Sequence, residues 1–264
     1  MDEVSVVPQA SWRVVVAITS VGVGILLSAF IGLSIVELGG WEIQVSAAHG
    51  AEVGRTAAQM AVNAPLNDNR IPTGVVVALS IPLWLCLIAG PVWARTAGLE
   101  WRRDLNWGFR GIDIPLGLGL GVLTQLVIIP LVYIPIFAIF GEQDVESVAR
   151  NLVAAVDTPF DVAALILLTA IGAPIAEEIL YRGLLHQGLV DMHLDLGKAG
   201  LVLATVASSL LFAASHFQAL QLPGLFAFAV VAASVMHWSG RLGTAIWTHV
   251  GFNLTAVVAL LLRV

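Results

Sequence analysis

Long apolar stretches constrain this chain more than any other feature of its sequence. Of its 264 residues, 58% are hydrophobic and only 11% are charged, and the mean hydropathy is +0.92. A helix of about 20 apolar residues is long enough to cross a bilayer. We therefore predict an all-α fold, a polytopic transmembrane bundle in the lipid bilayer with about seven spans (six to eight). The predicted spans are Val14–Val36, Gly74–Ala94, Ile114–Phe140, Val162–Val190, Ala199–Leu220, Leu222–Trp238 and Leu242–Leu262.

Two segments between the spans are too polar or too short to cross. Ile43–Ala64 is polar, and Val145–Val156 has apolar residues at helical spacing, so we expect short helices or loops on the surface. No internal repeat or linker divides the chain, and we treat residues 1–264 as a single membrane domain. The glycines of the segment GLGLG lie within a span, with no preceding strand and no following lysine. They predict close helix packing and not a nucleotide loop; they are Gly117, Gly119 and Gly121.

The charged residues indicate orientation and exclude one class of partner. Eighteen acids and twelve bases give a net charge of −6, with no basic block that would suggest a nucleic-acid partner. Basic residues near span ends mark cytoplasmic loops. We expect the loop between the second and third spans, and hence the amino terminus, to be cytoplasmic; its arginines are Arg95, Arg102, Arg103 and Arg110.

The fourth predicted span contains two adjacent acids and a base. Charged groups at membrane depth are costly unless they are paired or line a polar cavity, so they indicate function. Residues four apart share a helix face, which places Glu178 beside Arg182 and turns Glu177 by about 100° toward Tyr181. We predict that Glu178 is the paired, structural acid and that Glu177 is available. Pro174 lacks a backbone N–H and is expected to weaken or bend the helix one turn earlier, which could open a pocket.

Two other spans offer polar groups on single helix faces. Phe212 and His216 share a face of the fifth span, and His249 and Asn253 share a face of the seventh. Helices in lipid turn such groups inward and toward one another. We therefore expect His216, His249 and Asn253 to meet Glu177 in the interior of the bundle.

This set of groups suits hydrolysis of an acyl bond by water. A glutamate held away from bulk water can act as general base near neutral pH, and His216 can share or orient the water's proton. His249 and Asn253 can donate hydrogen bonds to the oxygen that becomes negatively charged. Ser215 is the serine expected near the pocket, but no nucleophile elbow surrounds it, which disfavours serine catalysis.

Three alternatives stay open at this point. Glu177, His216 and His249 form the His₂Glu set that binds catalytic zinc, although no HExxH helix is present. The acids and Arg182 could instead form a purely structural ion network. A transporter with the acids as a proton relay is disfavoured, because the two halves show no paired repeats.

Three motifs carry a resemblance to a known family. EEILYR at residues 177–182, FAASH at 212–216 and HVGFN at 249–253 resemble the EExxxR, FxxxH and HxxxN motifs of the CAAX-protease and bacteriocin-processing (CPBP, or Abi) family of intramembrane endopeptidases. The resemblance implies an all-helical membrane fold, a CAAX-protease-like catalytic core at residues 162–262 and hydrolysis of a peptide bond in a membrane-associated protein or peptide. It also implies the plasma membrane of a bacterium as the location.

The resemblance also implies roles for individual residues. Glu177 and His216 would activate water, and His249 and Asn253 would form the oxyanion site. Supporting roles would fall to Glu178, Arg182 and Phe212. Family members are described both as metalloproteases and as glutamate-dependent enzymes, so a zinc cofactor remains an alternative. Other members are linked to bacteriocin maturation or resistance, which leaves a non-proteolytic scaffold or bacteriocin-immunity protein as a further alternative.

Overall fold

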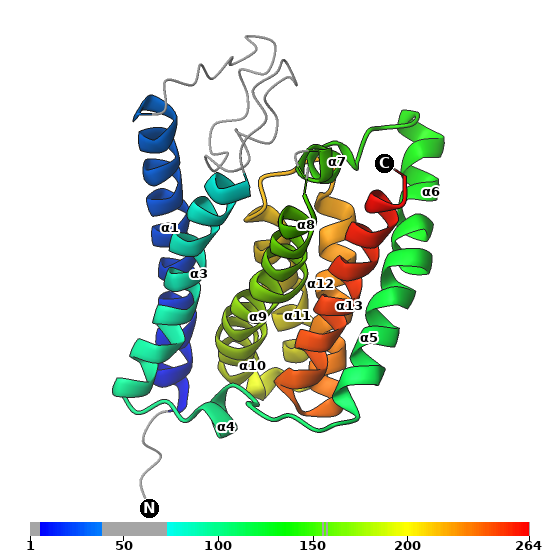
Figure 1. Ribbon diagram of the computed structural model, residues 1–264. Helices are drawn as coiled ribbons and strands as arrows, with labels where there is room; N and C mark the ends of the chain where they lie inside the picture. Colours follow the sequence, from blue (N-terminus) through cyan, green and yellow to red (C-terminus); the bar gives the residue numbers. More distant parts are fainter. Residues whose placement is uncertain (1–5, 39–72, 155, 157, 264) are drawn as a thin grey trace, which may run out of the picture.

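The computed structural model describes residues 6–38, 73–154, 156 and 158–263, and its regular elements are helices (Figure 1). Three of them, η2, η3 and η4, are π-helical turns within longer helices, and η5 is a short 3₁₀ turn. The elements are α1 (Val6–Leu38), α3 (Thr73–Thr96), α4 (Trp101–Asp104), α5 (Asp113–Leu123), η2 (Thr124–Ile128), α6 (Ile129–Phe140), α7 (Ser147–Ala154), α8 (Pro159–Leu165), η3 (Ile166–Gly172), α9 (Ala173–Glu178), η4 (Ile179–His186), α10 (Gln187–Met192), η5 (Leu194–Leu196), α11 (Lys198–Ala214), α12 (Leu222–Ser239) and α13 (Leu242–Leu261).

The helices confirm the predicted all-α membrane bundle. Five continuous segments are long and apolar enough to cross a membrane: Ala10–Ile35, Asp113–Phe140, Pro159–Met192, Leu222–Ser239 and Leu242–Leu261. The other two predicted spans coincide with α3, which has 24 residues, and with the shorter apolar helix α11. The predicted surface segment Val145–Val156 contains α7, whereas Ile43–Ala64 lies outside the described residues.

One long helix lies at the centre of the bundle. It comprises α8, η3, α9, η4 and α10, with α1 and α3 packed together on one side and α13 on the other (Figure 1). Its η4 turn contacts α1, α3, α11, α12 and α13, and all eight residues of η4 are buried. The predicted fourth span, which carries the adjacent acids, is therefore the element around which the other helices pack.

The beginning of this central helix and its mid-course irregularity both follow from its sequence. Thr158 and Asp161 form a capping box, in which each side chain bonds the backbone of the other, and Pro159 occupies a position where no N–H is needed. Further along, the backbone adopts the π-helical turn η3, which ends at Gly172, just before Pro174. The predicted irregularity one turn before the acids is thus present.

The predicted end of the fifth span is wrong. We expected the helix to continue to Leu220, but α11 ends at Ala214. Carbonyl groups in the last turn of a helix lack backbone donors. Here the Phe212 carbonyl accepts hydrogen bonds from the Ser215 hydroxyl and the His216 ring, each at 2.8 Å. These side chains cap the helix, and His216 consequently lies just beyond its end.

Glycines allow α5 and α13 to approach closely. A Cβ atom on Gly117 would come within 2.5 Å of the Trp247 Cβ, and one on Gly121 within 2.7 Å of the Gly251 carbonyl carbon. A Cβ atom on Gly119 would meet no other element within 4 Å in the described part of the chain. The packing interpretation of the glycine segment is confirmed for Gly117 and Gly121, while Gly119 faces away.

We expect a Gly121→Ala variant to unfold at a lower temperature than the wild-type protein, because the new methyl group would collide with the backbone of α13. Overpacking of this kind costs about 1–3 kcal/mol. Gly119→Ala is the matched control, since its methyl group points into open space and alanine favours helix. Thermal unfolding in detergent measures the difference, and equal midpoints for the two variants would contradict the packing role of Gly121.

Candidate active site

Glu178 is fully buried between a cation and an imidazole. Its Oε1 lies 3.0 Å from Nη1 of Arg182, on the next turn of the same helix, and accepts a hydrogen bond from Nδ1 of His249 at 2.8 Å. The exposed fraction of the Glu178 side chain is 0%. The predicted pairing of Glu178 with Arg182 is therefore confirmed, and His249 from α13 is a second partner that helical periodicity alone did not indicate.

Aromatic rings surround Arg182. Its guanidinium carbon lies 4.4 Å from the ring centre of Phe212 and 5.7 Å from that of Phe228, at distances where a cation is attracted to the ring face. Nη2 also approaches the Ala229 carbonyl at 3.5 Å. The helices that supply these rings, α11 and α12, thereby contact the same ion pair.

His249 lies between the two adjacent acids. A carboxylate can only accept hydrogen bonds, so the Nδ1 that contacts Glu178 carries the proton. The other nitrogen, Nε2, is 3.8 Å from Oε2 of Glu177, which is too long for a direct hydrogen bond. The ring packs against Phe228, with 4.5 Å between ring centres. His249 is thus fixed through Glu178 and presents its second nitrogen toward Glu177.

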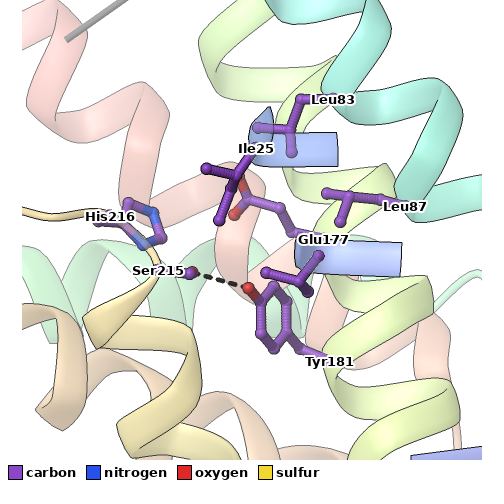
Figure 2. A pocket seen from close by; sticks show the side chains of 8 residues that line it. Ile25, Leu83, Leu87, Glu177, Tyr181, Ser215 and His216 are labelled. Atoms are coloured by element: carbon purple, nitrogen blue, oxygen red, sulfur yellow. Dashed lines mark hydrogen bonds between the residues drawn. The ribbon is translucent and has the colours of Figure 1, made fainter. Parts of the chain in front are cut away.

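Glu177 faces a cavity of about 90 Å³ (Figure 2). One side of this cavity is aliphatic and comes from α1 and α3, and the rest comes from the central helix and the end of α11. The side chain of Glu177 is 14% exposed, whereas that of Glu178 is 0% exposed. This difference is expected because the two residues lie on different faces of the helix. A water molecule needs roughly 10–15 Å³ of such space, so the cavity can hold water. Its lining residues are Val21, Ile25, Leu83, Leu87, Glu177, Tyr181, Ser215 and His216.

His216 lies across the cavity from Tyr181 (Figure 2). Its Nδ1 donates to the Phe212 carbonyl at 2.8 Å, so in the neutral ring Nε2 carries no proton and can accept one. The Tyr181 hydroxyl donates to Ser215 at 2.7 Å, and the Ser215 hydroxyl donates to the same Phe212 carbonyl. The single proton of Ser215 is therefore directed at a backbone oxygen, which does not activate this serine as a nucleophile.

Asn253 is directed at the backbone of the central helix. Its Nδ2 donates to the Thr169 carbonyl in η3 at 2.7 Å, and it is not among the residues that line the cavity. The structure therefore brings Glu177 and His216 to one cavity and places His249 beside Glu177. One N–H of the Asn253 amide is instead bonded to the Thr169 carbonyl, outside the cavity lining.

Sequence reasoning missed the aliphatic side of the cavity. Val21 and Ile25 come from α1, and Leu83 and Leu87 from α3. Apolar residues fill both helices, so nothing in the sequence distinguishes those facing a cavity from those facing lipid. Tyr181 was identified only as a neighbour of Glu177, and its bond to Ser215 depends on the packing of α11 against η4.

The predicted zinc ligands do not form a metal-binding group in this arrangement. Among the described residues, no three His, Cys, Asp or Glu side chains are gathered as metal ligands would be. A catalytic zinc site requires three protein ligands around one point, and these three side chains do not provide them in this arrangement.

We expect an Arg182→Gln variant to lose much of its stability, because Glu178 would remain as a buried carboxylate without its cation. Removing one partner of a buried ion pair costs about 3–5 kcal/mol. The shift in the thermal unfolding midpoint measures the loss. Arg150→Gln is the control, since the ion pair of Arg150 with Asp144 is exposed and no shift is expected. A double variant Glu178→Gln with Arg182→Gln should be damaged less than Arg182→Gln alone; equal damage would contradict this account.

Comparison with known proteins identifies the region that contains this site. A family model described as type II CAAX prenyl endopeptidase Rce1-like matches residues 159–255, which include the whole central helix and all three motifs. No curated protein matches the chain, and no solved structure does. Residues 159–255 are therefore similar to the type II CAAX prenyl endopeptidases, in agreement with the family resemblance that the three motifs carry.

Proposed function

We propose that this protein is an intramembrane endopeptidase that hydrolyses a peptide bond of a membrane-associated protein or peptide with water activated by Glu177 and His216. The family match supports a CAAX-type protease. The observation that carries the mechanism is that Glu177 and His216, which are far apart in the sequence, line one cavity. A carboxylate and an imidazole that can reach the same water are the groups that general-base hydrolysis requires.

The proposed reaction begins with proton transfer from water to Glu177. The water's oxygen attacks the carbonyl carbon of the substrate peptide, and the carbonyl oxygen takes the negative charge. Nε2 of His216 accepts a hydrogen bond from the other O–H of the water and so orients the attacking oxygen. When the C–N bond breaks, the carbonyl re-forms and Glu177 returns its proton to the leaving amine, so the enzyme ends as it began.

His249 is the proposed donor to the negatively charged oxygen. Its Nδ1 bonds Glu178, and its Nε2, on the side of Glu177, would donate as part of an imidazolium ring. Such a donor beside the cavity would stabilise the tetrahedral intermediate. Asn253 keeps its predicted place as a second donor only through the other N–H of its amide, since the first bonds Thr169.

The cavity also bears on the class of substrate. Four aliphatic residues from α1 and α3 face Glu177, and these two helices expose further large apolar side chains on their outer surfaces. An apolar or prenylated residue next to the scissile bond would suit such surroundings.

We propose that the protein lies in the plasma membrane of a bacterium, with its amino terminus in the cytoplasm. A scaffold or immunity protein would not require polar groups around a cavity.

We expect Glu177→Gln and His216→Ala variants to lose activity by about 10²–10⁴-fold, the usual contribution of a general acid or base. The assay uses protein reconstituted in lipid vesicles and peptides with a cysteine four residues from the carboxyl terminus, farnesylated or unmodified. Mass spectrometry detects the released fragment.

Ser215→Ala is the matched control, because Ser215 lines the same cavity but has no nucleophilic role in this mechanism. It should retain activity within about tenfold of wild type. Unfolding midpoints establish that each variant is folded. Full activity of the Glu177→Gln and His216→Ala proteins would refute the mechanism, as would a complete loss confined to Ser215→Ala.

A further inference from the structure

The π-helical turn η3 leaves one backbone carbonyl of the central helix without its usual donor. A π-helical turn is characterised by bonds from an N–H to the carbonyl five residues earlier, and the N–H of Ala173 bonds the Leu168 carbonyl in this way. The next pair in the same register is Pro174 with Thr169. Proline has no N–H, so the Thr169 carbonyl receives nothing from that position.

A side chain from another helix supplies the missing donor. Nδ2 of Asn253, in α13, bonds the Thr169 carbonyl at 2.7 Å, and the two residues are 84 positions apart in the sequence. In an apolar bundle an unsatisfied carbonyl is costly. We infer that Asn253 is a positioning residue, whose amide replaces the backbone N–H that Pro174 lacks.

The second contact of α13 with the central helix explains why this bond would matter for the site. His249, one turn before Asn253 on α13, bonds Glu178. The side chains of α13 thus hold the central helix at two points, Thr169 and Glu178, and Glu177 lies between them in the sequence. We call this pair of contacts the α13 clamp. Its effect on catalysis rests on the proposed function, whereas its effect on stability does not.

The test is a cycle of four proteins: wild type, Asn253→Ala, Pro174→Ala, and the double variant. An alanine at position 174 restores a backbone N–H at the position that pairs with Thr169. We expect Asn253→Ala alone to lower the unfolding midpoint by roughly 2–4 °C and to reduce peptidase activity about tenfold or more. In the Pro174→Ala background the same Asn253 substitution should shift the midpoint by less than half as much, and activity should recover in parallel.

Equal losses from Asn253→Ala in both backgrounds would overturn the inference, because a residue that only contacts substrate gains nothing from an N–H at position 174. Rescue of the midpoint in proteins that never cleave peptide would support the α13 clamp and count against the proposed function.

A second variant keeps the test decisive if the Pro174 proteins do not fold. Asn253→Asp nearly preserves shape but places an acceptor against the Thr169 carbonyl, so it should lower the midpoint more than Asn253→Ala does. Thr255→Ala is the control on α13, since the Thr255 hydroxyl bonds the Gly251 carbonyl of its own helix. A wild-type midpoint for Asn253→Asp would overturn the inference.

Discussion

The buried contact of Glu178 with Arg182 and His249 is the interaction on which the rest of the site depends. A carboxylate with no exposed surface is tolerated only where a cation and hydrogen-bond donors face it. Arg182 provides the charge from the same helix and His249 provides a donor from α13. Because Arg182 also contacts Phe212 of α11 and Phe228 of α12, this one ion pair fixes the positions of four helices.

The same interaction gives two adjacent acids different chemistry. Glu178 is turned into the bundle and held, so Glu177 must point about 100° away, and this direction leads to the cavity beside α1 and α3. The end of α11 meets the cavity from the other side, where the Phe212 carbonyl sets the tautomer of His216. The helix geometry and the partners of Glu178 together explain why Glu178 is held in the bundle while Glu177 faces the cavity.

Helical periodicity in the sequence predicts part of the fold and of the candidate site. The apolar helices, the pairing of Glu178 with Arg182 and the irregularity before the acids depend on neighbours within a turn or two, and all three are present. The end of α11 depended on side chains of Ser215 and His216 folding back on Phe212, which hydropathy does not register. The partners of Asn253 and His249 depended on how α13 packs against the central helix, and no single-helix pattern encodes that packing.

The central claim is that Glu177 and His216 act on one water molecule. The most direct measurement is an experimental density map of the protein in a lipid nanodisc, at a resolution where ordered water is visible. We predict a water in the cavity within hydrogen-bond reach, about 2.6–3.2 Å, of both a Glu177 carboxylate oxygen and Nε2 of His216. A cavity filled by a lipid chain, or a water that contacts neither group, would contradict the account.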